Sequence, residues 1–191
     1  MEAPNWKRHV RSFILPLLAC GIIPSGAYLL EIRYLPDLMA VPFHWMTELF
    51  SESIIPWLQP IRWIVTVLLI LVGILLWLLT VRLFHNVGRG TLAPWDPAQR
   101  LVTIGPYACC RNPMITGVLF IILGEALVIG SALIFGWCLF FFMINTLYFI
   151  FSEEPGLRKR FGEEYIEYCA RVSRWWPHCR RAARLHSLSQ S

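Results

Sequence analysis

Long apolar stretches separated by short polar segments are the dominant pattern of this chain. Residues 12–30 and 61–84 form the first two stretches, and residues 115–151 form a third that is longer than either. A transmembrane α-helix needs about 20 apolar residues. The pattern therefore predicts one span over residues 12–30, a second over 61–84, and two more in the third stretch, which Gly130-Ser131 would divide into a helical hairpin.

Two details refine this pattern. Pro16 and Pro24 lie within the first stretch, so we expect that helix to be kinked. Residues 41–55 form a weaker amphipathic segment, which we expect to be interfacial or re-entrant, and which would be a fifth span if it inserts. The predicted fold class is all-α, a polytopic membrane protein with about four to five transmembrane helices.

The composition agrees with a membrane protein. Hydrophobic residues make up 57% of the chain and charged residues 15%, with a mean hydropathy of +0.55. Soluble domains contain about half apolar and about a quarter charged residues. With 191 residues, the chain is expected to form a single domain over residues 1–191.

The basic residues predict the orientation of the spans. All but two of the 17 Lys and Arg residues fall at the N-terminus, in the segment 85–114 and its borders, or after residue 151; the exceptions are Arg33 and Arg62. By the positive-inside rule, both termini and the 85–114 segment are cytoplasmic. We interpret the net charge of +5 as topology and contact with anionic membrane lipids, which argues against a nucleic-acid partner. No convincing cleavage site follows the first stretch, which we therefore expect to be retained as a span.

The six cysteines carry no C-x-x-C spacing. Cys109 and Cys110 are adjacent, in a segment assigned to the reducing side of the membrane, where disulfides are disfavoured. We therefore expect cysteines that act as small apolar residues. No His and Cys cluster has metal-ligand spacing, so no metal site is predicted.

Polar residues concentrate in two places that are both predicted to be cytoplasmic. The first is the loop 105–113, and the second begins with Glu153-Glu154, where the last apolar stretch ends. Residues 152–177 have the pattern of a helix with a break at Phe161-Gly162, and we expect them to form a cytosolic helical cap over the inner ends of the spans. A water-soluble cosubstrate would reach such a site from the cytosol and a lipophilic one from the bilayer. The basic residues 178–191 are expected to be a disordered tail.

Several short motifs occur in a fixed order between residues 85 and 177. They are Asp96-Pro97, Leu101-Val102, Gly105-Pro106-Tyr107, Arg111-Asn112-Pro113, Glu153-Glu154, Phe161-Gly162-Glu163-Glu164-Tyr165 with Tyr168, Arg171-Val172 and Pro177. Together they resemble the superfamily of isoprenylcysteine carboxyl methyltransferases and phospholipid methyltransferases. The resemblance implies an integral membrane enzyme that uses S-adenosylmethionine, with residues 85–177 as its cofactor-binding core.

The resemblance also implies which residues contact the cofactor. Carried over by position, they are Gln99, Arg100, Leu101, Val102, Tyr107, Asn112, Pro113, Met114, Ile115 and Glu153. Physical chemistry suits three of them. Arg100 can pair with the cofactor's carboxylate, Tyr107 offers a ring for adenine, and an ionised Glu153 accepts hydrogen bonds from ribose hydroxyls or the amino group.

Arg111 and Glu125 are the candidates for the catalytic side of the site. Arg111 would contact the acceptor, or serve only as a topology charge or a lipid headgroup contact. Glu125 lies within a predicted span, where an ionisable group is costly and is by default a functional candidate. It would either take part in catalysis or maintain the fold by hydrogen bonding, for example to Asn145.

Two positions depart from the family pattern. Ile115 stands where the family often has Tyr, and Phe149 stands where members that methylate prenylcysteine have an Arg that engages the acceptor. The predicted function is transfer of a methyl group to a lipophilic acceptor, either an isoprenylcysteine-type carboxylate or a related small lipid. A phospholipid N-methyltransferase and a thiol S-methyltransferase are alternatives. A sterol-reductase-like enzyme that uses NADPH and a non-catalytic membrane protein remain as hypotheses of other classes.

Overall fold

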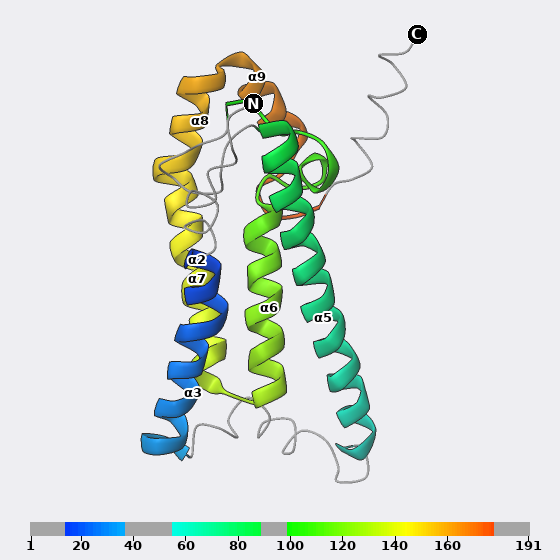
Figure 1. Ribbon diagram of the computed structural model, residues 1–191, viewed down its shortest axis with the longest axis vertical. Helices are drawn as coiled ribbons and strands as arrows, with labels where there is room; N and C mark the ends of the chain where they lie inside the picture. Colours follow the sequence, from blue (N-terminus) through cyan, green and yellow to red (C-terminus); the bar gives the residue numbers. More distant parts are fainter. Residues whose placement is uncertain (1–13, 37–54, 89–98, 178–191) are drawn as a thin grey trace, which may run out of the picture. The chain divides into compact units, whose positions relative to one another are not determined.

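A computed structural model of the chain describes residues 14–36, 55–88 and 99–177 (Figure 1). Within this part the secondary structure is helical, and no strand occurs, which confirms the all-α prediction. The helices are α2 (Ile14–Leu17), η1 (Leu18–Ile22), α3 (Ile23–Tyr34), α5 (Ile55–Leu83), η3 (Phe84–Gly88), η4 (Gly105–Ala108), α6 (Pro113–Ile129), α7 (Ala132–Tyr148), η5 (Phe149–Glu153), α8 (Glu154–Phe161) and α9 (Glu163–Arg171).

Two helices are long and apolar enough to cross a membrane among the described residues, namely Leu58–Leu83 and Ala132–Phe161. The second of these ranges includes α7, η5 and α8, which follow one another without a break. Helix α6 has 17 residues. At a rise of 1.5 Å per residue it is about 26 Å long, which is less than the thickness of about 30 Å of the hydrocarbon core of a bilayer. The predicted first span contains the π-helical turn η1 between Pro16 and Pro24, and the kink expected at these prolines stays a prediction. The predicted count of four to five spans is therefore not confirmed, and the cytosolic cap stays a prediction.

Two further sequence predictions lie outside the described residues. They are the amphipathic segment 41–55, apart from its last residue, and the disordered tail 178–191.

The chain divides into two compact units. The first unit comprises Met1–Ser12, Leu76–Thr116 and Asn145–Ser191, and the second comprises Phe13–Leu75 and Gly117–Ile144. Helices α5, α6 and α7 contribute residues to both. The single-domain organisation stays a prediction.

In the second unit, α6 and α7 form the predicted helical hairpin at Gly130-Ser131 (Figure 1). Gly130 has a φ of 75°, a conformation that favours glycine. Ser131 begins α7 as an N-cap, because its Oγ accepts a hydrogen bond of 3.1 Å from the Ile134 N–H. The fully buried Glu31 accepts one of 3.0 Å from the Ala132 N–H, and the Ser131 hydroxyl donates to its second oxygen. These bonds fix the start of α7.

Helices α5 and α6 approach closely in the second unit at two glycines. A Cβ atom added to Gly73 would lie 2.6 Å from the Gly117 carbonyl oxygen, and one added to Gly124 would lie 2.6 Å from Ile70 Cγ1. Small residues at such contacts allow two helix backbones to pack directly, which is the usual way helices associate in lipid.

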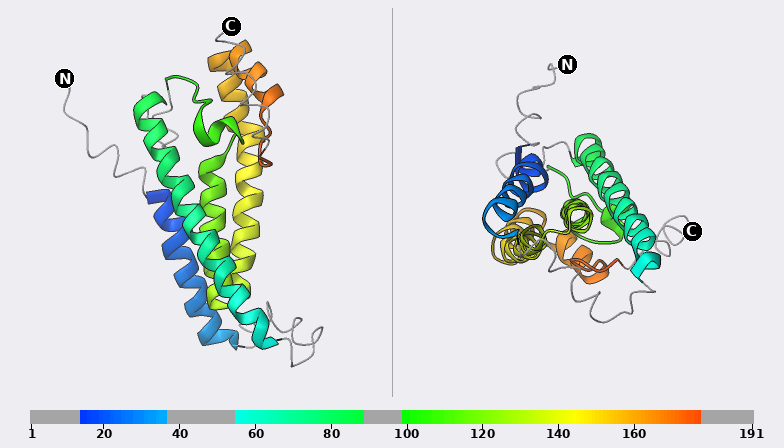
Figure 2. Two further views of the ribbon diagram at one scale, coloured as in Figure 1. Left: turned by 90° about the vertical axis from the view of Figure 1, so that its right-hand side faces the viewer. Right: turned by 90° about the horizontal axis from the view of Figure 1, so that it is seen from below.

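In the first unit, α8 and α9 are separated by Gly162, which confirms the predicted break at Phe161-Gly162 (Figure 2). Gly162 has a φ of 54°. The buried face of α9 consists of Tyr165 and Tyr168, which pack with Val172 against a partly buried set that includes Leu101. Helix α9 is thereby attached to the loop that precedes α6.

Candidate functional site

The Gly105-Pro106-Tyr107 segment is a tight turn that buries the tyrosine. Gly105 has a φ of 61°, and a Cβ atom there would lie 3.0 Å from Leu83 Cδ1, so glycine is favoured on two grounds. Pro106 opens the 3-10 turn η4, and its carbonyl oxygen accepts hydrogen bonds of 3.1 Å from the N–H groups of both Cys109 and Cys110. The turn directs Tyr107 inward, where 8% of its surface remains exposed.

Tyr107 is surrounded by aromatic and acidic groups. Its ring lies 5.6 Å from that of Phe84 at an angle of 58°. Its carbonyl oxygen accepts a hydrogen bond of 2.8 Å from the Tyr168 hydroxyl. Burial raises the pKa of the Tyr107 hydroxyl well above its usual value, and the negative field of Glu153 raises it further. At neutral pH Tyr107 is therefore a neutral hydroxyl close to an acidic side chain.

The Arg111-Asn112-Pro113 segment joins the start of α6 to the end of the described chain. The Arg111 N–H donates a hydrogen bond of 2.9 Å to the Ser173 carbonyl, and the Asn112 side-chain amide donates one of 3.4 Å to the Arg174 carbonyl. The Asn112 carbonyl accepts from the Thr116 N–H and hydroxyl, and the buried Pro113 begins α6. Proline is well suited to this first helical position.

The two adjacent glutamates have different surroundings. Glu154 accepts hydrogen bonds from two guanidinium nitrogens of Arg174, at 2.7 and 3.0 Å, and pairs with Arg111 at 3.2 Å. This carboxylate raises the pKa of Arg174. Glu153 is half-buried and makes no hydrogen bond or ion pair with any described residue. Glu153 therefore differs from Glu154, whose two oxygens are both occupied by arginine side chains.

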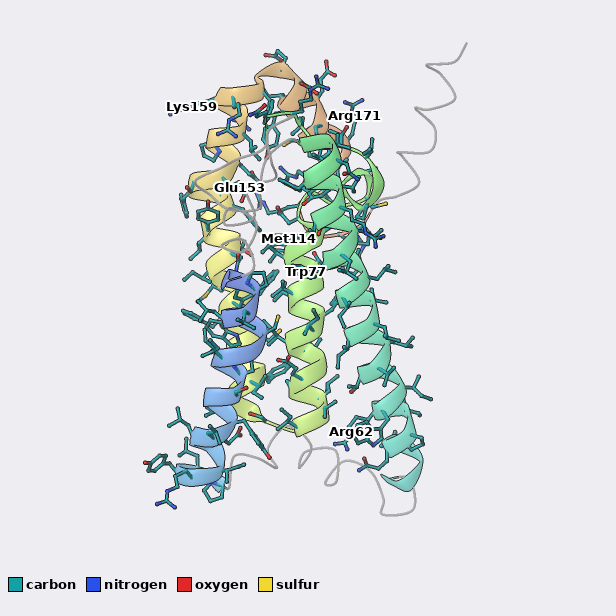
Figure 3. All side chains as sticks on the ribbon, viewed as in Figure 1. Arg62, Trp77, Met114, Glu153, Lys159 and Arg171 are labelled. Atoms are coloured by element: carbon teal, nitrogen blue, oxygen red, sulfur yellow. The ribbon has the colours of Figure 1, made fainter. Side chains whose placement is uncertain are left out.

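The structure collects the predicted cofactor residues in one unit. All ten of them, and Arg111, belong to the first unit, and Figure 3 labels Met114 in the first turn of α6 and Glu153 where α7 passes into α8. Gln99 and Arg100 are exposed, as a contact with a charged ligand group requires. The remaining members are either half-buried or buried; Val102, Tyr107 and Pro113 form the buried set.

Glu125 belongs to the second unit and is not among these residues. It is half-buried, its Oε2 is buried without a hydrogen-bond partner, and it lies close enough to Cys20 for the two to interact electrostatically. Its catalytic role stays a prediction.

Several residues of this region were not recognised from the sequence. Arg174 counted only as a topology charge, yet it is the main partner of Glu154. Phe84 ended an apolar stretch, yet its ring contacts Tyr107. Neither contact has a local signal, because the partners are far apart in the chain. Tyr165 and Tyr168, which belong to the last of the longer motifs, are buried and pack together.

The cysteines differ from expectation at one position. Cys20, Cys110, Cys138 and Cys169 are free, whereas Cys109 is disulfide-bonded. The expectation of a thiol at Cys109 was wrong; it rested on a cytoplasmic assignment of the loop that the structure does not show. The Cys169 sulfur accepts a hydrogen bond of 3.0 Å from Arg111 Nη1. The described residues contain no group of three or more potential metal ligands.

Comparison with known families gives a match to part of the chain. A family model described as phospholipid methyltransferase matches residues 61–164, which is more than half of the chain and includes the 105–113 loop, Glu153 and Glu154. No curated protein and no solved structure shows significant similarity to the chain.

Proposed function

The chain belongs to the phospholipid methyltransferase family, and from this premise we propose that it transfers the methyl group of S-adenosylmethionine to the amine of a membrane phospholipid. The observation that carries the proposal is the pair formed by Tyr107 and Glu153 in the first unit. One is a buried aromatic hydroxyl, the other a half-buried carboxyl group that has no hydrogen bond or ion pair within the described part of the chain, and they interact electrostatically. An aromatic ring next to a free acceptor suits a ligand that contains adenine, ribose and a sulfonium.

We propose that ten residues bind the methyl donor. They are Gln99, Arg100, Leu101, Val102, Tyr107, Asn112, Pro113, Met114, Ile115 and Glu153. In this assignment the exposed Arg100 pairs with the donor's carboxylate, and Glu153 accepts hydrogen bonds from its ribose or amino group. A negative charge at Glu153 also favours a nearby sulfonium.

The bound donor supplies a methyl group that is already activated by a positively charged sulfur. The acceptor would react as the neutral amine, after its ammonium form has given a proton to the solvent: its lone pair would form the new N–C bond as the C–S bond breaks, leaving a methylated ammonium and a neutral thioether. The residues of this chain mainly have to hold acceptor and donor in line and exclude water, since orientation supplies much of the rate of such a reaction.

Phe149 supports an amine acceptor over a carboxylate. It occupies the position where prenylcysteine-methylating members carry an acceptor-binding Arg, and only 4% of its surface is exposed. Its ring lies 5.6 Å from that of Trp175. A carboxylate has no cation to pair with at this position, whereas an amine needs none. For Arg111 we propose a contact with the lipid phosphate, because its Nε–H is buried without a hydrogen-bond partner.

The first test is calorimetric binding of S-adenosylmethionine and S-adenosylhomocysteine to the protein in detergent, beside NADPH. We expect both methyl-donor ligands to bind and Glu153→Ala to abolish binding, with Glu164→Ala, an exposed glutamate of the same unit, as the matched control. Binding of NADPH alone would support the reductase hypothesis instead. No binding by any of the three ligands in folded protein would support a non-catalytic role.

The second test identifies the acceptor. Donor carrying a labelled methyl group is incubated with the protein and either phosphatidylethanolamine or an isoprenylcysteine analogue. We expect label in the phospholipid in a form stable to alkali, because an N-methyl bond is not hydrolysed. Label found only in the isoprenylcysteine analogue and released by alkali would identify a methyl ester and a carboxylate acceptor.

A further inference from the structure

Glu153 and Glu154 are adjacent, yet among the described residues only Glu154 pairs with arginine side chains. We propose that Glu154 is a positioning residue, which fastens the C-terminal cover (residues 163–177) to the 105–113 loop and thereby sets the affinity for the methyl donor without contacting it. The part of this inference that concerns donor affinity rests on the proposed function.

The acceptor capacity of Glu154 is already used within the protein. Its Oε1 lies 2.7 Å from Arg174 Nε and 3.2 Å from Arg111 Nη1, and its Oε2 lies 3.0 Å from Arg174 Nη2. Arg174 thus makes a bidentate contact with Glu154, the geometry that makes arginine–carboxylate pairs strong and directional. The three side chains are 15–28% exposed, so solvent screens these charges less than those of surface ion pairs.

Glu154 lies between the 105–113 loop and the cover and contacts both of them. Arg111 belongs to the loop that also carries Tyr107 and Asn112, and Arg174 belongs to the cover, so a single carboxylate holds one cation from each. Without it, two guanidinium groups would face each other and repel.

Three other hydrogen bonds cross the same boundary. The Tyr168 hydroxyl donates to the Tyr107 carbonyl at 2.8 Å, the Arg111 N–H donates to Ser173, and the Asn112 amide donates to Arg174. Two of the three end at residues 173–174, directly beside the Glu154 contact. Loss of the Glu154 carboxylate would therefore weaken the attachment of the loop residues assigned to the donor.

Burial links this attachment to affinity. Tyr107 exposes only 8% of its surface, and Tyr168, the cover residue that bonds to its carbonyl, exposes 5%. A water-soluble ligand that reaches Tyr107 therefore requires the cover to open and then to close. When only a fraction of the protein is in the closed state, the apparent Kd rises by the reciprocal of that fraction. Removal of the Glu154 charge is expected to lower the fraction of protein in the closed state and thereby to raise the apparent Kd. A saturating concentration of donor is expected to restore the closed state.

The test compares variants of Glu154, of its partner Arg174 and of its neighbour Glu153. In full-length protein in detergent, Glu154→Gln, Glu154→Asp, Arg174→Lys and Glu153→Gln are each measured for S-adenosylmethionine Kd by calorimetry and for the rate of tryptic cleavage after position 174 in the absence of ligand. We expect Glu154→Gln to raise the Kd by about tenfold and to accelerate cleavage, with smaller effects of the same sign in Glu154→Asp, which keeps the charge. Glu154→Asp also provides a folded variant if Glu154→Gln aggregates. The Arg174→Lys variant tests the bidentate contact by changing the partner of Glu154 instead of Glu154 itself. Trypsin still cleaves after a lysine, so the same cleavage site can be followed.

The outcomes separate positioning from binding. Glu153→Gln should raise the Kd while the ligand-free cleavage rate stays at the wild-type value, and saturating donor should slow cleavage of Glu154→Gln to the wild-type rate. A raised Kd in Glu154→Gln with unchanged ligand-free cleavage would mean that Glu154 touches the donor, and would overturn the proposal. If the wild-type protein binds no S-adenosylmethionine, the proposed function fails, whereas the cleavage rates still decide whether Glu154 fastens the cover: faster cleavage supports it and an unchanged rate overturns it.

Discussion

The hydroxyl of Tyr168 donates a hydrogen bond of 2.8 Å to the backbone oxygen of Tyr107, 61 residues earlier in the chain. Both residues are buried, and the bond joins α9 to the turn that carries the candidate donor site. A buried carbonyl without a partner is costly. This single hydroxyl therefore couples the stability of α9 to the geometry of the turn.

Replacement of Tyr168 by Phe should destabilise the protein by about 1–3 kcal/mol, the usual cost of leaving a buried polar group unsatisfied. The change keeps the ring, which packs with Tyr165 and Val172, so packing is preserved. The measurement is thermal unfolding in detergent, with Tyr148→Phe, an exposed tyrosine, as control. Equal melting temperatures for the two variants would show that the hydrogen bond contributes nothing.

Replacement of Gly73 by Ala should destabilise the α5–α6 contact, because the new Cβ would lie 2.6 Å from the Gly117 carbonyl oxygen. Backbone cannot move aside as a flexible side chain can, so we expect a loss of about 1–3 kcal/mol. Gly136→Ala is the matched control, since it lies within α7 and nothing is found within 4 Å of its added Cβ. Helix propensity predicts that the control is neutral or slightly stabilising. A stable Gly73→Ala protein with a native melting temperature would contradict the close approach.

Periodicity and length were sufficient to predict most of the helices. The second apolar stretch became α5, and Gly130-Ser131 and Phe161-Gly162 divided their helices as expected. These predictions rest on local chemistry, namely apolar length and glycine conformation. The number of spans was less predictable because helix ends depend on tertiary contacts. The π-helical turn η1 divided the first stretch into pieces that composition alone did not reveal.

The sequence motifs grouped the candidate site residues, but they gave no indication of the contacts that these residues make. The motifs placed Tyr107, Asn112 and Glu153 in one functional group, and the structure places all of them in one compact unit. The different roles of Glu153 and Glu154 had no signal in the sequence, because the partner of Glu154 lies 20 residues away. Ionic partners at that separation are chosen by the fold, which no local pattern encodes.

Glu31 shows the same limit in the second unit, where it lies just after the predicted first span and no sequence motif includes it. It is fully buried and bonds to the Ser131 hydroxyl and the Ala132 N–H at the start of α7. Glu31→Ala should cost about 1–3 kcal/mol, since the buried Ser131 hydroxyl and the partly buried Ala132 N–H lose their acceptor. Unfolding of Glu31→Ala, Ser131→Ala and the double variant should give a double-mutant cycle in which the combined loss is smaller than the sum. Additive losses would mean that the two side chains act independently.

The buried tyrosines of the first unit predict how stability depends on pH. Burial raises the pKa of Tyr107 and of Tyr168 above the ordinary value of 10.0, so the folded protein keeps both hydroxyls neutral where the unfolded chain would ionise. Because the folded pKa is the higher one, the stabilisation is fully present below about pH 10 and is lost as the pH rises through the folded pKa values. We expect the free energy of unfolding to fall between pH 9 and pH 11, and the fall to be smaller in Tyr107→Phe, which has no hydroxyl to ionise. Chemical denaturation at the two pH values measures the fall, and tyrosinate absorbance near 295 nm identifies the ionising groups. An equal fall in the wild-type protein and in Tyr107→Phe would mean that Tyr107 ionises as readily in the folded protein as in the unfolded chain.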